Sequence, residues 1–356
     1  NCQCDKCFNK EALARIMLME NLNLTAGIKE LSVTKTGALR IDWTNDHQSH
    51  YEAEWLKQRA FTEEAKHKRH STYRLPKRQW SSDHKIAKLD YSFVLEKDEG
   101  LLQLLIELEI TGAVLLQNTP SDPTAAFNIC NKVAKVKYTH YGELSNVIVV
   151  PNPNNVAFTG AALNLHNDIV QYHDMPGMIF LHMIKQHTGE GGETTLSDGL
   201  YAAEQMREIH PELFHLLTTT PVYFWDIGEA DPADNTRVKD FYKISKEPTI
   251  KLDISGAVTH IRFNNQIRDS FLDLAVDQVD DFYKALKTYF ELIHANSIGF
   301  KMTDGDMTVV DNVRCQHGRT GFTGPSSPRH LVTTYLAWDE ALCKRRRLQQ
   351  KCSRNQ

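Results

Sequence analysis

The residues with the clearest chemical potential are His166 and Asp168, which are separated by a single residue. On an extended chain, residues i and i+2 point to the same side, so the imidazole and the carboxylate can converge on one metal ion. His317, far downstream, is a candidate third ligand. Two histidines and one carboxylate, with the other coordination positions open, form the ligand set of non-haem Fe(II) oxygenases. A His-x-Asp pair also arises by chance, so these residues alone do not establish a metal site.

Arg329 strengthens the metal hypothesis. It follows His317 by twelve residues, beyond a loop rich in glycine, proline and serine, and it opens a predicted strand over residues 329–338. Alternation along that strand places Arg329 and Tyr335 on one face. An arginine held in a pocket binds a carboxylate through two parallel hydrogen bonds, which is what a 2-oxoglutarate cosubstrate requires at the end remote from a metal. A surface salt bridge is the alternative for Arg329 taken alone.

The motifs around these residues resemble those of one family, the γ-butyrobetaine dioxygenases and trimethyllysine dioxygenases. The similar segments are spread over nearly the whole chain, at residues 154–159, 166–168, 176–177, 181–186, 191–192, 198–199, 263–265, 268–269, 311–312 and 317–319. The resemblance implies that His166, Asp168 and His317 bind Fe(II) and that Arg329 holds the distal carboxylate of 2-oxoglutarate. It also implies that a C–H bond of a small molecule is hydroxylated with O2 while 2-oxoglutarate is converted to succinate and CO2. Ascorbate could serve as the reductant.

The same resemblance implies contacts to the two organic ligands. Leu181 would line the 2-oxoglutarate site, and Asn155 would help to bind substrate or cosubstrate. Asn264 would hold the polar end of the substrate. Tyr141, Phe158 and Tyr335 match positions of an aromatic cage that holds a quaternary ammonium group by cation–π attraction.

The cage departs from the family pattern at two positions. Ser145 stands where γ-butyrobetaine dioxygenase has a tryptophan, and Phe158 replaces a tyrosine. Tryptophan offers the best cation–π face, so its loss weakens the hold on a trimethylammonium group, although Glu143 could compensate by charge. We therefore expect γ-butyrobetaine or a related trimethylammonium compound as the substrate, with a different small amine or acid as the alternative.

Two other classes of protein are compatible with the same candidate metal ligands. A non-catalytic metal-binding scaffold would not need Arg329 in addition to the three metal ligands. A hydroxylase or demethylase acting on proteins would need an open groove for a peptide instead of a cage. Measuring succinate formation with trimethylammonium compounds, amino acids and peptides would separate these classes.

A second metal site is predicted at the start of the chain. Cys2, Cys4 and Cys7 supply three thiols within six residues, and a tetrahedral structural zinc needs one more ligand. The family resemblance places that ligand at His47. Thiols in a frayed terminus are the alternative for the cysteines taken alone. A zinc ion would stabilise a small domain, residues 1–72, that has little core of its own.

The rest of the chain is predicted to be a linker, residues 73–88, followed by a dioxygenase domain, residues 89–356. Short strands dominate that domain, one of them at 156–159, and helices at 201–217, broken at Pro211, and 278–294 interrupt them. The apolar stripe of the second of these helices suits core or dimer packing. A further helix is expected at 51–68. The fold class is therefore mainly β with helical insertions, and the pattern suits the double-stranded β-helix, a jelly-roll barrel that the resemblance also implies.

Composition narrows the classes of partner. The 356 residues are 41% hydrophobic and can bury a sizeable core, while a formal net charge of −4 disfavours nucleic acid as the main partner. No apolar run is long enough to span a membrane. Seven cysteines without a disulfide-like framework favour a reducing compartment. We expect a cytoplasmic homodimer, with a mitochondrial location as the alternative because a leader could be missing before the cysteine motif.

Overall fold

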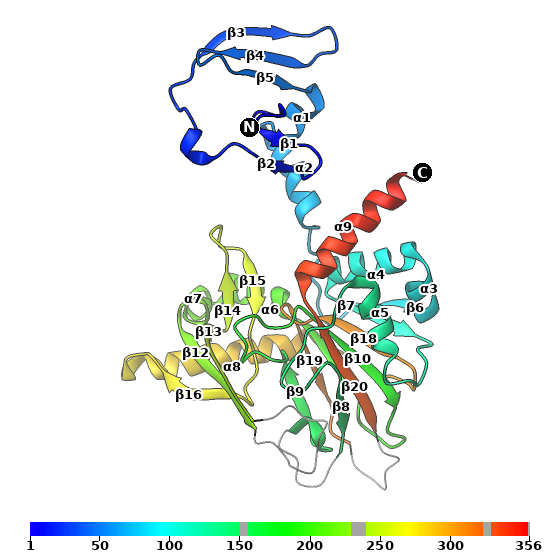
Figure 1. The fold of residues 1–356 in the computed structure, drawn as a ribbon. Helices are drawn as coiled ribbons and strands as arrows, with labels where there is room; N and C mark the ends of the chain where they lie inside the picture. The colour runs from blue at the N-terminus through cyan, green and yellow to red at the C-terminus, as the bar shows by residue number, and fades with distance from the viewer. Residues whose placement is uncertain (150–155, 229–239, 323–328, 355–356) are drawn as a thin grey trace. The chain divides into compact units, whose positions relative to one another are not determined.

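The computed structural model describes residues 1–149, 156–228, 240–322 and 329–354. By its internal contacts the chain divides into two compact units, Asn1–Leu75 and Pro76–Gln356, and each is described by itself (Figure 1). The segment predicted as a linker contains buried and paired residues. Trp80 is buried and its indole N–H donates to the carbonyl of Thr111 at 2.7 Å. Ala87 and Lys88 belong to a strand of the larger unit.

The first unit is built on a small antiparallel sheet. Its elements are β1 (Phe8–Asn9), β2 (Ala14–Arg15), a 3-10 turn η1 (Met19–Asn21), β3 (Ile28–Val33), β4 (Leu39–Trp43), β5 (Gln48–Tyr51), α1 (Ala53–Gln58) and α2 (Glu63–Tyr73). Strands β3, β4 and β5 pair in that order. The single helix predicted at 51–68 is wrong, because Thr62 caps a second helix by accepting from the N–H of Ala65 at 3.3 Å.

Two sheets carry the core of the second unit. The larger sheet has the order β6-β7-β18-β10-β20-β8, formed by Ala87–Asp90, Ala113–Gln117, Met307–Asp311, Met178–Lys185, His330–Leu336 and Ser145–Ile148. The smaller sheet has the order β17-β11-β19-β9, formed by Ile298–Phe300, Thr194–Asp198, Cys315–Arg319 and Leu163–His166. The prediction of a barrel is corrected here, since these two sheets are separate and the described strands form no closed barrel. Helices contribute enough of the unit to make it mixed α/β instead of mainly β.

Alternation along β10 shows how the layers are arranged. Met178 and Phe180 face a cluster with helices α3 (Tyr91–Glu96), α4 (Asp98–Thr111) and α5 (Ala125–Val133). Ile179 and Leu181 belong to a different cluster that contains residues of both sheets. One face of the larger sheet is therefore covered by helices, and the other face packs toward the smaller sheet.

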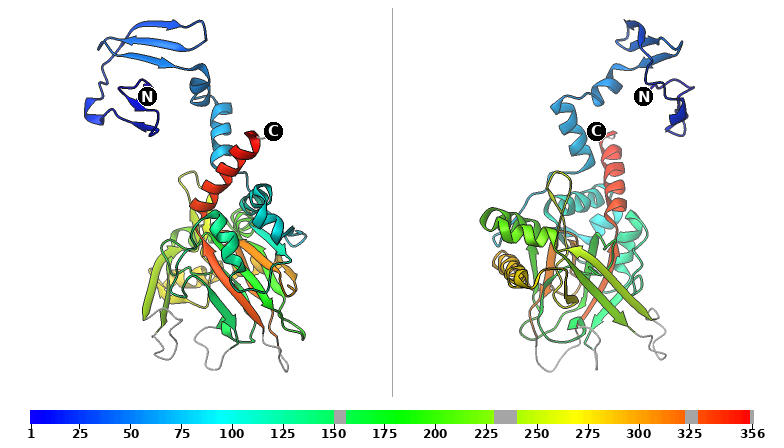
Figure 2. Two further views of the ribbon diagram at one scale, coloured as in Figure 1. Left: turned by 45° about the vertical axis from the view of Figure 1, so that its right-hand side comes forward. Right: turned by 90° about the vertical axis from the view of Figure 1, so that its left-hand side faces the viewer.

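A third cluster is formed by helices α6 (Gly199–Ile209), α7 (Pro211–Thr219) and α8 (Val279–Ala295). They lie on a different side of the sheets from α3–α5 (Figures 1 and 2). The predicted break at Pro211 is confirmed, since Pro211 begins α7. On α8, Phe282, Leu286 and Ile293 are buried in this cluster, so the stripe predicted there forms core.

Several elements were not predicted. The strands β12 (Pro221–Gly228), β13 (Phe241–Pro248) and β16 (Arg268–Leu272) form a separate sheet, β14 (Ile250–Leu252) and β15 (Val258–Ile261) form a hairpin, and η3 (Val276–Gln278) precedes α8. The strand predicted at 156–159 is wrong, because Val156–Phe158 form a 3-10 turn, η2. The strand predicted at 329–338 ends earlier, at Leu336, and Trp338 starts a terminal helix, α9 (Trp338–Arg354).

A buried ion pair joins the two sheets. Arg314 donates from Nε and Nη2 to both carboxylate oxygens of Asp198, at 2.9 and 2.7 Å, and both side chains are almost completely buried. Asp198 also accepts from the N–H of Leu200 and so caps α6. The ion pair therefore links β11 and α6 to the turn between β18 and β19. The candidate metal ligand His317 lies on β19, just after that turn. Within the described part of the chain, no helix is long and apolar enough to cross a membrane.

Candidate active site

The three predicted iron ligands meet in one place. His166 Nε2 lies 3.1 Å from Asp168 Oδ1, and His317 Nε2 lies 3.5 Å from the same oxygen. Ligand atoms at right angles around a metal, with bonds of about 2.1 Å, are about 3 Å apart, so the observed separations fit one octahedral ion. Both histidines are buried, at 6% exposure each. The donor set therefore fits Fe(II).

Strand pairing brings the two histidines together. His166 ends β9 and lies directly opposite His317 on the antiparallel strand β19. Gly318 permits this close approach, because a Cβ at that position would lie 2.6 Å from the carbonyl oxygen of Leu163. His166 Nδ1 lies 2.8 Å from the carbonyl oxygen of Asn164, so the proton is assigned to Nδ1 and the lone pair of Nε2 is left for a metal.

Two asparagines fix the loop that carries Asp168. Asn312 accepts from the N–H of Asp168 at 2.9 Å and donates to the carbonyl of Asp168 at 2.9 Å. Asn167 is fully buried and donates to the carbonyl oxygens of Asn312 and Cys315. Ile169, directly after the carboxylate, has a φ of 59°, a left-handed value that a β-branched residue rarely adopts. The carboxylate is therefore held by its neighbours in a strained turn.

The electrostatics of the site favour a carboxylate and a neutral histidine. Burial raises the pKa of Asp168, but the charges and hydrogen bonds of His317 and His166 outweigh burial and hold this pKa well below its usual value. Burial, followed by the proximity of His166, lowers the pKa of His317. Tyr335 donates its hydroxyl to Asp168 Oδ2 at 2.7 Å, and burial together with that carboxylate raises the pKa of Tyr335 well above its usual value. These are the protonation states that bind a metal.

Arg329 lies immediately before β20 with only 6% of its surface exposed. Burial, together with the nearby Arg319, lowers its pKa to about 10, so it remains a cation near neutral pH. Within the described residues its Nε has no hydrogen-bond partner and no carboxylate forms an ion pair with it. A buried guanidinium with an unused donor fits the distal carboxylate of 2-oxoglutarate. Its guanidinium carbon also lies 6.0 Å from the ring centre of Phe322.

The predicted substrate residues line one pocket beside the metal ligands. They are Tyr141, Ser145, Phe158, Asn264 and Tyr335, together with His166 and Asp168. Leu181 lies on β10 opposite Thr333 and belongs to the cluster between the sheets that also contains Tyr335. Asn155 lies outside the described residues. Glu143 is not among the described residues that line the pocket; it is exposed, and its backbone carbonyl accepts from the hydroxyl of Thr334.

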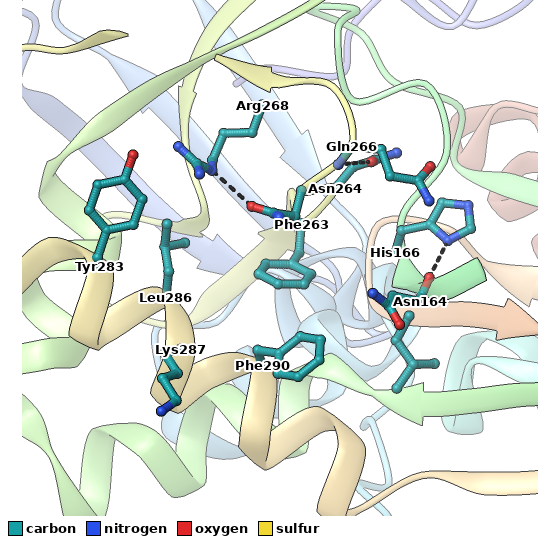
Figure 3. A pocket seen from close by; sticks show the side chains of 12 residues that line it. Asn164, His166, Phe263, Asn264, Gln266, Arg268, Tyr283, Leu286, Lys287 and Phe290 are labelled. Carbon is teal, nitrogen blue, oxygen red and sulfur yellow. Dashed lines mark hydrogen bonds between the residues drawn. The ribbon is translucent and has the colours of Figure 1, made fainter. Parts of the chain in front are cut away.

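A larger cavity of about 310 Å³ adjoins this pocket on the other side of His166. Figure 3 shows Phe263 and Phe290 facing one another across it, with Leu286 beside them. Its walls come from the residues around β16 and from α8, and it shares His166, Asn264 and Gln266 with the substrate pocket. The space around the candidate metal site therefore extends toward α8.

Sequence reasoning missed three polar residues around the substrate pocket. Asp226 comes from β12, and Gln171 follows Asp168 on the chain; both line the pocket. His140 is buried behind them and lies 3.1 Å from Asp226 Oδ2. A run of aromatic and apolar residues around Asp226 marks a strand, but no local motif relates that strand to the metal ligands.

The cysteine cluster lies in the first unit. Cys2, Cys4, Cys7 and His47 place one ligand atom each within 4.8 Å of all the others. The distances from His47 Nε2 to the sulfurs of Cys4 and Cys7 are 3.9 and 3.6 Å. Ligand atoms of a tetrahedral zinc site are roughly 3.5–3.8 Å apart, so this cluster fits a zinc ion.

Two facing histidines, one carboxylate and a buried arginine on two packed sheets define a mononuclear non-haem iron dioxygenase that uses a 2-oxo acid. The chain belongs to the taurine catabolism dioxygenase TauD, TfdA family, whose model matches residues 73–335. It is therefore an Fe(II)- and 2-oxoglutarate-dependent dioxygenase, which confirms the predicted class of enzyme.

The relatives agree with the predicted family. The chain is 34% identical to γ-butyrobetaine dioxygenase of Homo sapiens over 99% of this chain and 89% of that protein. It is 28% identical to trimethyllysine dioxygenase of Meyerozyma guilliermondii, over 96% of this chain and 86% of that protein. Among solved structures, a taurine dioxygenase from Burkholderia xenovorans shares the fold with a TM-score of 0.52 at 15% identity, covering 72% of this chain and 89% of that one.

Proposed function

We propose that this enzyme hydroxylates γ-butyrobetaine or a closely related small trimethylammonium carboxylate. The observation that carries the proposal is the 34% identity to a γ-butyrobetaine dioxygenase across 99% of the chain, together with the iron-ligand set and the buried Arg329. The substrate pocket is small and lies beside the metal ligands, which suits a small molecule better than a peptide.

Each residue has a defined role in this proposal. His166, Asp168 and His317 would hold Fe(II), which, when bound, activates O2 for oxidation of a C–H bond as 2-oxoglutarate is converted to succinate and CO2. Arg329 would bind the distal carboxylate of 2-oxoglutarate, with Leu181 beside it. The two packed sheets exclude water from the reacting atoms. Asn155 is proposed, on the family resemblance, to help to bind substrate or cosubstrate.

The substrate would be held at its two ends. Tyr141, Phe158 and Tyr335 would face the ammonium group, and Asn264 would bind the carboxylate. Asn264 is fixed for this role, because its side-chain N–H donates to the carbonyl of Asn167 at 3.2 Å and its carbonyl oxygen accepts from the N–H of Gln266 at 3.1 Å. Holding both ends places the carbon chain between them at the metal.

A different small amine or acid is the second candidate substrate. The observation that favours it is Ser145, which lines the pocket where the family resemblance expects a tryptophan. A serine gives no cation–π face and leaves space beside Tyr141.

We further propose that Cys2, Cys4, Cys7 and His47 bind a structural zinc ion in an N-terminal domain of residues 1–72, joined by a linker (73–88) to the dioxygenase domain (89–356). Ascorbate is proposed as the reductant that maintains Fe(II), and a homodimer as the assembly. A cytoplasmic or mitochondrial location is proposed; a trimethyllysine dioxygenase of Homo sapiens, 28% identical, is named as mitochondrial.

The test is to measure succinate formed from 2-oxoglutarate by the Fe(II)-loaded enzyme with separate substrates. γ-Butyrobetaine, trimethyllysine, 4-aminobutyrate, free amino acids and a histone-like peptide form the panel. We expect γ-butyrobetaine to stimulate succinate formation most, with one hydroxylated product per succinate. Stimulation by the peptide alone would contradict the proposal, and stimulation by an unmethylated amine alone would favour the second candidate.

A further inference from the structure

Asp226 is a carboxylate in the wall of the substrate pocket that the proposed function does not use. It comes from β12 and lines the pocket together with Tyr141 and Ser145. The Tyr141 hydroxyl donates to Asp226 Oδ2 at 3.2 Å, and Gln171 Nε2 donates to the same oxygen at 3.2 Å. The cage ring that the family resemblance places against the ammonium group is therefore tied directly to a carboxylate.

The geometry of Asp226 leaves one oxygen for a ligand. His140 Nε2 lies 3.1 Å from Oδ2, so all three protein partners reach that oxygen, while Oδ1 accepts no hydrogen bond from any residue that the structure describes. The Asp226 side chain is 20% exposed, whereas the His140 side chain is 1% exposed. The carboxylate is thus anchored from behind and keeps an open side.

Among the described residues that line the pocket, the negative side chains are not matched by lysine or arginine. The carboxylates among its described lining residues are Asp168 and Asp226, and no lysine or arginine is present among them. Asp168 belongs to the candidate metal site, where a bound Fe(II) would compensate its charge. Asp226 therefore contributes a negative charge to a partly desolvated space, where a charge interacts more strongly than in water.

We propose that Asp226 is the counter-ion of the substrate's cationic group and determines the preference of this pocket for a cation. This inference rests on the proposed function, because that function places the cationic group at Tyr141. The attraction of Asp226 replaces the binding that a tryptophan at position 145 would supply, and it acts on a quaternary ammonium and on a protonated amine alike. Glu143, which is exposed and precedes β8, does not line the pocket and does not serve this purpose.

The test compares ligands that differ only in charge. γ-Butyrobetaine is paired with 5,5-dimethylhexanoate, in which carbon replaces nitrogen, and 4-aminobutyrate is paired with pentanoate. Dissociation constants are measured by calorimetry with the enzyme loaded with Fe(II) and 2-oxoglutarate in the absence of O2. The variants are Asp226→Asn, Asp226→Glu, Tyr141→Phe and, as a control for loss of an exposed carboxylate, Asp277→Asn.

We expect the wild type to prefer the cation of a pair, and Asp226→Asn to reduce that preference roughly tenfold while the neutral member binds as before. Asp226→Glu should restore part of the preference, Asp277→Asn should leave it unchanged, and Tyr141→Phe should keep most of it. Binding of 2-oxoglutarate should be the same in all variants. A preference that survives in Asp226→Asn would overturn the inference, as would an equal weakening of both members, since that indicates a structural role.

The two ligand pairs also distinguish a failure of this inference from a failure of the proposed function. If neither member of the γ-butyrobetaine pair binds, but 4-aminobutyrate is preferred over pentanoate only when Asp226 is present, then the trimethylammonium substrate is wrong and the counter-ion stands. If the wild type shows no preference for the cation in either pair, the counter-ion is wrong.

Discussion

At the scale of single residues, the candidate iron site has three ligand atoms and no further carboxylate or histidine in the described residues close enough to replace one. His166→Ala or Asp168→Ala should therefore lower turnover of 2-oxoglutarate by more than about 100-fold. The fold should persist, because Asn167 and Asn312 hold the loop through their own hydrogen bonds. Succinate formation and the melting temperature are the measurements. The exposed His173→Ala is the matched control, and turnover retained in either ligand variant would reject the site.

The aromatic cage can be tested by removing the ring of Tyr141 and by adding a tryptophan ring at position 145. Tyr141→Ala should raise KM for γ-butyrobetaine five- to thirtyfold, equivalent to about 1–2 kcal/mol of lost binding. Ser145→Trp should improve γ-butyrobetaine turnover, because it adds the best cation–π face to a pocket that Ser145 lines. Steady-state kinetics are the measurement. If the natural substrate is a different amine, Ser145→Trp should obstruct the enzyme's own reaction, and efficient wild-type turnover of γ-butyrobetaine with no response to either change would show that the cage is misplaced.

At the scale of elements, β10 carries a buried histidine that links stability to pH. His182 is fully buried between β18 and β20, and neither ring nitrogen has a hydrogen-bond partner among the described residues. Burial lowers its pKa from 6.5 to about 4. Between these values the unfolded chain binds more protons than the folded protein, so this histidine removes stability as pH falls from about 6.5 to about 4 and has no such effect at higher pH.

The His182→Leu variant should remove this dependence. Relative to pH 7.5, the wild type should lose about 2 kcal/mol more unfolding free energy at pH 5 than the variant does. Urea unfolding at the two pH values gives the comparison, and the exposed His215→Leu is a control for loss of a histidine that stays hydrated. Equal losses in wild type and His182→Leu would show that the histidine is protonated inside the fold.

At the scale of the whole molecule, the first unit has little core of its own, since every residue of β3 is exposed. A zinc ion at Cys2, Cys4, Cys7 and His47 would supply stability that burial does not. Cys4→Ser should release one zinc ion per chain and make the first unit more sensitive to protease, while iron binding is retained. Metal analysis and limited proteolysis check this, with the exposed Cys343→Ser as the control. Purified wild type without zinc would end the hypothesis.

The sequence by itself determined the chemistry that depends on local spacing. Alternation along the strand after Arg329 follows from strand geometry alone, which sets the side chains that share a face. His166 and Asp168 converge as predicted, although Asp168 lies in a turn beyond β9 and not on an extended strand. The same reasoning placed the helix break at Pro211 correctly, since it depends on neighbouring residues.

Only the tertiary structure decided which distant residues meet. Glu143 is close to the cage residues in sequence but lies outside the pocket, while Asp226 reaches the pocket from an unpredicted strand. The open pair of sheets, the turn at Val156–Phe158 and the terminal helix α9 were also beyond local patterns. The physical reason is that strand pairing and the packing of side chains between layers select among local conformations of similar energy, and those contacts join segments far apart in the chain.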